Sequence, residues 1–181
     1  MLHLKNITAG NPKTAEQYQM TKKYDVTWLF SEDDKNWYEE LKNFASDTIK
    51  IAYTGDGRVV WVGKDVTGIN PDNASVIEVP DVTANRRITV PGYWFYRDGN
   101  FIFDYKLKAE DERDALLQHA SIMTSEWEKD LLLGLISNED REKLKAYRIY
   151  AKSLQAMDFS AVTDKASYNA IEWPVSPEAS S

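Results

Sequence analysis

The strongest constraint on the fold is a change of residue pattern between residues 105 and 109. Seven of the eight glycines lie before Lys106, between short runs rich in Val, Ile, Tyr, Trp and Phe, which is typical of strands joined by tight turns. From Leu107 onward glycine is nearly absent and apolar residues recur at helical spacing. We therefore predict an α+β protein, with a β-rich domain of antiparallel strands over residues 1–106 and an antiparallel α-helical hairpin after it.

The β-rich domain contains six predicted strands and two well-defined turns. The strands cover residues 25–30, 48–54, 58–63, 75–80, 93–97 and 100–105. Gly55-Asp56-Gly57 is expected to join the second strand to the third, and Asp98-Gly99 to join the last two through a two-residue turn that needs positive φ. Ahead of the strands, Thr14 followed by Gln17 resembles a capping box for a short helix that ends near Lys23.

The helical hairpin is predicted over residues 107–157 from two apolar stripes. These are Leu116, Ala120, Met123, Trp127 and Leu131 on the first helix, and Leu144, Tyr147, Ala151 and Leu154 on the second. Gly134 suits the end of the first helix, and Ser137 with Asp140 suits the start of the second. Residues 158–181 lose this periodicity, and we expect an extended tail that carries one aromatic cluster, Ile171-Glu172-Trp173-Pro174.

The composition excludes several classes of protein. With no cysteine the chain has no disulfide, no thiolate nucleophile and no cysteine-based metal site, which favours a reducing compartment. Twenty-nine acidic residues against twenty-two basic ones give a net charge of -7, which opposes binding to nucleic acid. No apolar run approaches the ~20 residues of a membrane-spanning helix, and residues 1–10 lack the apolar core of a secretory signal. We expect a soluble, intracellular protein without membrane insertion.

The sequence shows no motif for catalysis or for holding a cofactor or metal ion. The two histidines, His3 and His119, lack the spacing of metal ligands, and no phosphate-binding loop occurs. Residues 33–36 do not continue into the ligand pattern of a calcium loop. Glu39 and Glu40 on a strand would point to opposite faces, which argues against the paired carboxylates of a glycosidase. We therefore expect no catalytic residue, no cofactor and no metal, and a binding function is favoured.

Aromatic and basic side chains are the remaining candidates for contacts with a partner. Three of the six tryptophans lie in apolar strands or in a helix stripe and are expected in the core, namely Trp28, Trp61 and Trp127. The pattern leaves Trp37, Trp94 and Trp173 open. Arg86-Arg87 fits either a sheet edge, where charge prevents strand pairing, or the polar rim of an interface, and the edge is favoured.

Several runs of residues follow one another in an order that points to a single family. They are Leu4-Lys5-Asn6-Ile7, Gly10-Asn11-Pro12-Lys13-Thr14, Glu16-Gln17-Tyr18-Gln19, Lys35-Asn36-Trp37-Tyr38-Glu39-Glu40, Asp47-Thr48-Ile49-Lys50-Ile51, Asn70-Pro71, Val79-Pro80-Asp81 and Thr83-Ala84-Asn85-Arg86-Arg87. Trp94 with Asp98-Gly99 continues the order. Together they closely resemble the tail fibre assembly proteins (Tfa) of tailed bacteriophages, the Mu-like branch especially. The paired helices and the Ile171-Glu172-Trp173-Pro174 cluster resemble the lambda-like relatives as well.

The resemblance implies a chaperone for one client, the tail fibre protein of a phage. Such a chaperone binds the C-terminal region of the fibre and assists its folding and trimerisation in the host bacterial cytoplasm, and some members stay on the fibre tip of the virion. We predict that the β-rich domain holds the fibre. The hairpin is predicted to support either oligomerisation or chaperoning, and in the first case a second copy of the chain is a further partner. The predicted partner-binding residues are Trp37, Tyr38, Trp94, Arg86 and Arg87.

Two alternatives and two departures from the family pattern stay open. The aromatic strands motivate a carbohydrate-binding module that contacts host cell-surface glycan, and the carboxylates alone motivate an enzyme such as a glycosidase.

Asp34 stands where the family pattern favours glycine, and Tyr93 where a small residue followed by lysine is commoner. The first departure leaves the turn before Trp37 open, because aspartate tolerates positive φ less readily than glycine.

Overall fold

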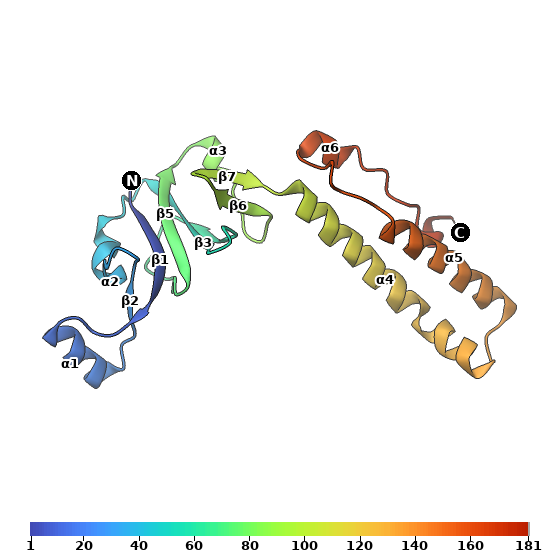
Figure 1. The fold of residues 1–181 in the computed structure, drawn as a ribbon, viewed down its shortest axis with the longest axis horizontal. Coiled ribbons are helices and arrows are strands. Elements are labelled where there is room, and N and C mark those ends of the chain that lie inside the picture. Colours follow the sequence, from blue (N-terminus) through green and yellow to red (C-terminus); the bar gives the residue numbers. More distant parts are fainter. Residues whose placement is uncertain (181) are drawn as a thin grey trace. The chain divides into compact units, whose positions relative to one another are not determined.

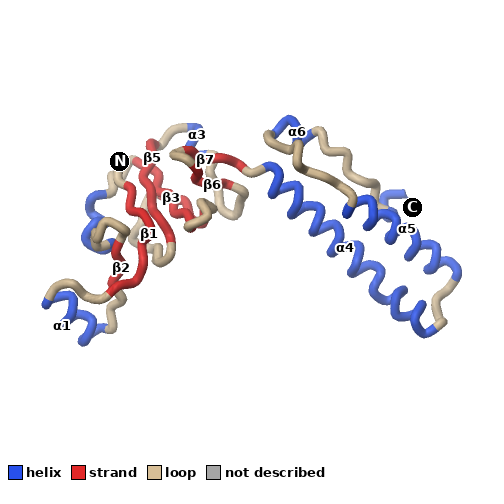
Figure 2. The backbone as a smooth tube through the Cα atoms, viewed as in Figure 1, coloured by secondary structure: helices blue, strands red, loops and turns tan. Residues whose placement is uncertain are grey.

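The computed structural model describes residues 1–180, with side chains to residue 178, and divides the chain into two compact units. The N-terminal unit is Met1–Phe103 and the C-terminal unit is Asp104–Ser181. Within the described residues, all strands belong to the N-terminal unit, and the C-terminal unit consists of helices and loops (Figure 2). The predicted α+β class with antiparallel strands is confirmed.

The N-terminal unit is built on a five-stranded antiparallel sheet with the order β2-β1-β5-β3-β4 (Figure 1). The strands are β1 (His3–Gly10), β2 (Trp28–Phe30), β3 (Thr48–Thr54), β4 (Val59–Gly63) and β5 (Ala74–Pro80). A separate two-stranded sheet pairs β6 (Trp94–Arg97) with β7 (Asn100–Phe103). The helical elements are α1 (Ala15–Tyr24), α2 (Trp37–Glu40), a 3-10 turn (Leu41–Asn43) and α3 (Thr83–Arg86).

Strand β1 was not among the predicted strands, although it lies inside the sheet between β2 and β5. Its two buried apolar residues, Leu4 and Ile7, are both 0% exposed and are three positions apart, whereas side chains on one face of a regular strand recur every two. The pairing of β1 with β5 shifts register between these residues, and Asn6 has φ 48. This bulge turns both side chains to the core. Because it interrupts the alternation of apolar and polar residues, the strand lacks the usual sequence pattern.

The region before β2 also differs from its prediction. Asp25 ends α1 in a left-handed conformation, so the strand predicted from residue 25 begins only at Trp28. The predicted helix start is confirmed, because Thr14 accepts a hydrogen bond from the Gln17 backbone N–H. The Gln17 side chain accepts from the Lys13 N–H rather than closing a capping box on Thr14.

The C-terminal unit is a hairpin of α4 (Tyr105–Leu133) and α5 (Asn138–Gln155), followed by α6 (Lys165–Asn169) and a 3-10 turn (Pro177–Ser180) (Figure 1). Both predicted helix ends are confirmed: Gly134 caps α4 with φ 70, and Ser137 accepts a hydrogen bond from the Asp140 N–H at the start of α5. Since β7 ends at Phe103 and α4 begins at Tyr105, the strand predicted to reach residue 105 is two residues too long.

The predicted stripe on α4 is buried only in its first part. Ala120 is 3% exposed within the hairpin core, whereas Met123 is 38% and Leu131 45% exposed. Trp127 is half-buried against Tyr147, with ring centroids 5.9 Å apart.

No helix within residues 1–180 is both long enough and apolar enough to cross a membrane.

Residues after α5 do not form the predicted extended tail. Phe159 and Val162 are buried with Ala109 of α4, and the ring of Trp173 packs at a tilt against that of Phe159 with centroids 5.6 Å apart. The Tyr168 hydroxyl donates to the Glu112 carboxylate at 2.6 Å. This segment therefore folds back as part of the core of the C-terminal unit, while the last predicted residue, Ser181, lies outside the described residues.

Candidate binding groove

A groove of about 390 Å³ lies in the N-terminal unit between β5, α3 and the β6–β7 hairpin. Its floor is apolar, because Val79, Ile88 and Phe101 belong to or pack against one buried cluster of the sheet. Amide and guanidinium groups lie among the lining residues, which are Ile77, Val79, Pro80, Ala84, Asn85, Arg87, Ile88, Trp94, Tyr96, Gly99, Asn100 and Phe101. An apolar floor with a few polar groups is the usual composition of a binding pocket, and this volume falls within the usual range of ~300–1,000 Å³.

The β6–β7 hairpin places Trp94 in this groove. The Asp98-Gly99 turn has φ values of 50 and 81, so the predicted two-residue turn with positive φ is confirmed. Trp94 pairs with Phe103 across the two strands, and their rings meet edge to face with centroids 5.3 Å apart. The Trp94 ring is half-buried, which leaves part of its surface open to the groove.

The hairpin is fixed to the larger sheet through the turn between β3 and β4. The Tyr96 N–H donates to the Gly57 carbonyl oxygen at 2.7 Å, and Arg58 and Phe95 form a β-bridge. Gly57 has φ 89, and a Cβ atom there would lie 2.5 Å from the Tyr96 carbonyl oxygen. The close approach of the β3–β4 turn to strand β6 therefore requires glycine at this position.

The two predicted arginines have different environments. Both lie at or just after α3 and not on a strand, so their assignment to a sheet edge is wrong. The Arg86 Nε donates to the Asp81 carboxylate at 2.6 Å, and Lys64 contacts the same carboxylate at 2.7 Å. Arg87 is exposed and lines the groove, with no ion pair or hydrogen bond of its side chain to residues 1–178. Arg87 is therefore the cation of this pair that is free to meet a ligand.

The contact between Arg86 and Asp81 should have a measurable effect on the pKa of the Asp81 carboxyl. Hydrogen bonds from Arg86, and then from Lys64, lower the pKa of the Asp81 carboxyl to about 2. We expect Arg86→Ala to raise the pKa of Asp81 toward its ordinary value, because the larger contribution is removed. A carboxyl-carbon NMR titration measures this shift, and Arg87→Ala is the matched control that should leave the Asp81 pKa unchanged. An equal rise in both variants would contradict the assignment of Asp81 to Arg86.

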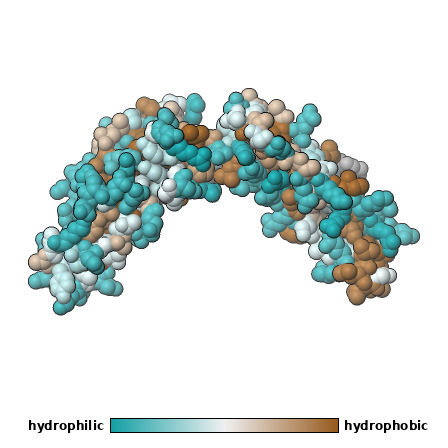
Figure 3. Space-filling view, in the orientation of Figure 1, coloured by the Kyte–Doolittle hydropathy of each residue, from teal (hydrophilic) through white to brown (hydrophobic). Residues whose placement is uncertain are grey.

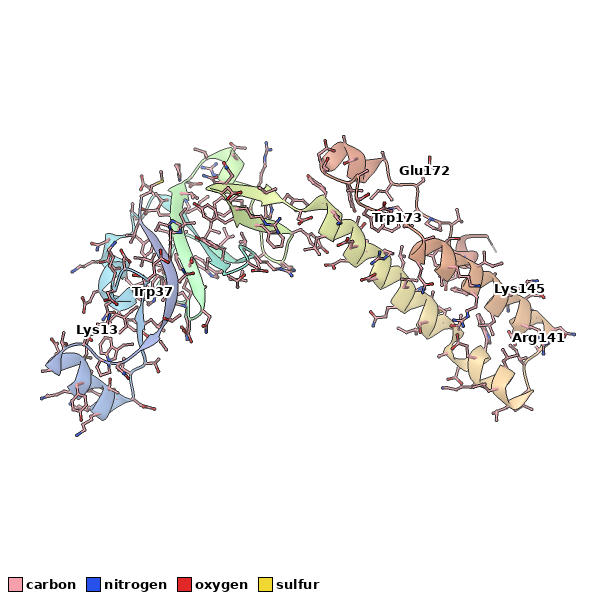
Figure 4. The ribbon with its side chains drawn as sticks, in the orientation of Figure 1. Lys13, Trp37, Arg141, Lys145, Glu172 and Trp173 are labelled. Atoms are coloured by element: carbon pink, nitrogen blue, oxygen red, sulfur yellow. The ribbon has the colours of Figure 1, made fainter. Side chains whose placement is uncertain are left out.

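Trp37 and Tyr38 lie outside the groove. Trp37 is only 2% exposed and belongs to the core cluster that contains Leu4 and Ile7, so its predicted role as a surface anchor is corrected to core packing (Figure 4). Tyr38 is 44% exposed, and its hydroxyl donates to the Thr27 carbonyl oxygen at 3.0 Å. Of the five predicted partner-binding residues, the groove brings together only Trp94 and Arg87.

The other tryptophans offer little free surface. Trp28 is 8% exposed and its indole N–H donates to the Thr21 hydroxyl at 2.8 Å, which confirms its place in the core. Trp61 is partly buried against the same core as Trp37. Trp173 belongs to the segment that folds back after α5 and packs against the core of the hairpin (Figure 4).

The carboxylates considered for catalysis have structural partners. Glu39 and Glu40 belong to or end the short helix α2 and not a strand, so the argument from opposite strand faces does not apply. Glu39 instead accepts hydrogen bonds from the amides of Gln17 and Asn36, and Glu40 from that of Asn43. Within the described residues no group of three His, Cys, Asp or Glu side chains could hold a metal ion.

Several groove residues were not singled out from the sequence, although a signal for them existed. The predicted Asp98-Gly99 turn fixes the pairing of β6 with β7, and alternation along each strand then places Trp94, Tyr96 and Phe101 on one face. The rings of Tyr96 and Phe101 indeed lie 5.0 Å apart. The contributions of Asn85 and Ile88 could not be found in this way, since α3 is too short to give a periodic pattern.

Comparison with known proteins identifies the family. The family model described as Caudovirales tail fibre assembly protein, lambda gpK, matches residues 39–178. The chain is 47% identical over 168 residues to tail fiber assembly protein U′ of Escherichia phage Mu, covering 90% of this chain and 95% of that protein. It is 40% identical over 184 residues to tail fiber assembly protein U of the same phage, covering 98% of this chain and all of that protein.

This chain belongs to the tail fibre assembly protein family of tailed bacteriophages. A probable tail fiber assembly protein of Escherichia phage P2 is also 40% identical over 98% of the chain. The resemblance inferred from the sequence motifs is therefore confirmed. For this tail fibre assembly protein, the family match includes the whole groove, from Ile77 to Phe101, and the hairpin of the C-terminal unit.

Proposed function

We propose that this protein is a chaperone for a tail fibre protein, whose C-terminal tip it binds during folding and trimerisation in the host bacterial cytoplasm. The observation that carries the proposal is the family match together with relatives that cover at least 90% of the chain and are named tail fibre assembly proteins. The chaperone works by binding alone, with no bond made or broken. The chaperone stays on the fibre tip of the finished virion if it dissociates from the fibre more slowly than the virion assembles.

The physics of the client explains why such a helper is useful. An intertwined trimeric β-fibre depends on contacts between residues far apart in sequence, and its single chains expose unpaired strand edges and apolar surface. Chains in that state aggregate readily. A protein that binds the fibre end lowers the concentration of free aggregation-prone chains in proportion to its affinity, and it consumes no nucleotide.

The groove has the chemistry of an anchor site for such a polypeptide end. Trp94 offers a half-buried aromatic surface, and Arg87 offers a free guanidinium at the same groove. Trp and Arg are the side chains that most often dominate the energy of protein interfaces. We propose that an apolar side chain of the fibre rests on Trp94 while a fibre carboxylate meets Arg87, with the amides of Asn85 and Asn100 available to its main chain.

The hairpin is proposed to support oligomerisation or chaperoning. Exposed leucines gather at the end of α4 and in the following loop, and Figure 3 shows apolar surface at that end of the hairpin. Leu132 is 86%, Leu133 70% and Leu135 72% exposed. A cluster of exposed apolar side chains is typical of a surface that contacts another polypeptide.

Co-expression of the fibre with variants of this chain tests the proposal. We expect Trp94→Ala and Arg87→Glu each to reduce the yield of detergent-resistant fibre trimer by about tenfold or more, because each removes a hot-spot side chain from the interface. Trp61→Ala is the control for a half-buried tryptophan outside the groove, and Lys42→Glu for an exposed charge reversal. Circular dichroism confirms that every variant is folded.

The outcomes separate the function from its site. If the fibre reaches its trimeric form equally well in cells without this protein, the chaperone function is contradicted. If the protein is required but both groove variants assist as well as the wild type, the function stands and the groove is not the binding site.

Carbohydrate binding is the alternative to this proposal. Its motivation is weakened because, among the described side chains, every tryptophan is at least half-buried. Glycan-array binding by the isolated protein that is lost in Trp94→Ala would favour this alternative over the chaperone.

A further inference from the structure

The outer face of α5 carries a continuous basic stripe formed by Arg141, Lys145, Arg148 and Lys152. Figure 4 shows the first two of these side chains on α5. At ~100° per residue, the spacing of i, i+4, i+7 and i+11 confines the four side chains to an arc of about 60°, over a length of about 17 Å. All four residues are exposed.

This stripe stands out against the charge of its own unit. Residues 104–181 contain ten cations and fifteen carboxylates, whereas residues 141–152 contain five cations and one carboxylate, Glu142. Half of the ten cations of the C-terminal unit therefore lie within twelve residues of α5, and four of these five share one face of the helix. Such segregation creates a local positive potential on a protein that is negative overall.

Contacts within the chain leave most of this charge unmatched. Lys145 lies 3.7 Å from a Glu142 carboxylate oxygen and Arg148 lies 3.9 Å from one of Glu128, and both pairs are long and exposed to solvent. Arg141 and Lys152 have no ion pair or hydrogen bond from their side chains to the described side chains. The opposite face of α5 packs on the core of the unit through Leu144, Tyr147, Tyr150 and Leu154, so the stripe faces away from that core.

One apolar side chain lies beside the stripe and indicates the class of partner. Ile149 is 59% exposed and follows Arg148 directly, about 40° from Lys145 around the helix. An acidic polypeptide segment can pair its carboxylates with the four cations and place an apolar side chain on Ile149.

We propose that this face of α5 is a docking site for an acidic polypeptide segment that carries one apolar residue between its carboxylates. Charge complementarity selects the segment, and Ile149 supplies the apolar contact. The site is separate from the groove in the N-terminal unit, and the proposal does not rest on the proposed role of that groove.

Fluorescence anisotropy with the full chain tests the proposal. The probe is a fluorescein-labelled helical peptide with glutamates at i, i+4, i+7 and i+11 and one leucine among them. The variant R141Q/K145Q/R148Q/K152Q removes the stripe, and the matched control K106Q/K129Q/K143Q/K165Q removes the same charge elsewhere in the unit. We expect the stripe variant to bind at least tenfold more weakly than the wild type, and the control to stay within about threefold.

Further measurements distinguish the docking site from general electrostatic attraction. Binding should weaken when the peptide glutamates are replaced by glutamine, and Ile149→Ser should weaken it with no change of net charge. Equal losses in the stripe and control variants, absence of binding by the wild type, or tighter binding of a single-stranded DNA of equal length would each overturn the proposal. Circular dichroism shows that the variants remain helical.

Discussion

Trp37→Ala should lower the free energy of unfolding of the N-terminal unit by about 3–5 kcal/mol, the usual cost of truncating a buried aromatic side chain. Trp37 is 2% exposed and is among the largest fully buried side chains of the protein. Its ring meets that of Phe44 edge to face at 5.9 Å and packs in one cluster with Leu4 and Ile7 of β1. Alanine would leave a cavity that the surrounding strands cannot fill, because their backbones are fixed by the sheet.

Native-state hydrogen exchange of the amides in β1, β3 and β5 measures this loss within the correct unit. The control is Tyr38→Ala at the neighbouring position, which is 44% exposed and loses one hydrogen bond to the Thr27 carbonyl. We expect the control to cost about 1 kcal/mol or less. A Trp37→Ala protein of unchanged stability that no longer binds the fibre would instead restore Trp37 as a surface anchor.

This experiment also decides how one motif of the family resemblance should be interpreted. The sequence Asn36-Trp37-Tyr38 suggested a pair of aromatic contacts for a partner. In the structure Asn36 caps α2 by accepting a hydrogen bond from the Tyr38 N–H at 2.9 Å, and the helix turns Trp37 into the core. The residue that packs the fold and the residue that meets a partner can be adjacent in sequence.

Local chemistry made some elements predictable. The Asp98-Gly99 turn and the caps at Gly134 and Ser137 depend on residues close together in sequence, and all three are present in the structure. At Asp34 the sequence left the turn open. This residue stands where glycine was expected and has φ 65, so the turn before Trp37 keeps its left-handed residue without glycine. Its carboxylate accepts from the Lys13 ammonium at 2.6 Å, a contact that glycine could not make.

Elements defined by distant contacts could not be predicted in the same way. The bulge at Asn6 of β1 is fixed by hydrogen bonds from Asn6 to Ser75 and Glu32, which lie 69 and 26 residues away. Helix α3 has four residues, too few for a periodic signal, and it sets the different environments of Arg86 and Arg87. Half of the groove was therefore visible as a β-hairpin, and the half contributed by α3 was not.

A buried carboxylate in the sheet leads to the second large expected effect. Glu78 is 5% exposed and accepts hydrogen bonds from the Leu2 N–H at 3.0 Å, the Ala45 N–H at 2.6 Å and the Thr48 hydroxyl at 2.7 Å. Across the strands it pairs with Lys50, which is 1% exposed and donates to the Ala45 and Thr48 carbonyls. The carboxylate thus joins the chain start to the turn before β3 through hydrogen bonds, and it lies opposite a buried cation whose charge favours its ionised form.

Glu78→Ala should lower the free energy of unfolding by about 3 kcal/mol, because it leaves three partly buried donors unpaired and removes the charge opposite the buried Lys50. Burial alone raises the pKa of the Glu78 carboxyl, but the hydrogen bonds from Leu2, Thr48 and Ala45 outweigh it and lower the pKa below its ordinary value. A lowered folded-state pKa means that the carboxylate stabilises the fold fully above the unfolded value of about 4.3, and that this contribution disappears as the pH falls through the folded value.

Urea unfolding between pH 3 and pH 7 checks both parts of this prediction. The difference in stability between the wild type and Glu78→Gln should be largest at neutral pH and should begin to shrink as the pH falls below about 4.3. It should be lost once the pH has passed through the lower folded-state pKa, where the wild-type carboxyl is as neutral as the glutamine amide. Glu16→Ala, at an exposed position of α1, is the matched control and should follow the wild type at every pH. A stability difference between the wild type and Glu78→Gln that stays constant from pH 3 to pH 7 would contradict the prediction. It would show that Glu78 acts through its shape and not through the negative charge that faces Lys50.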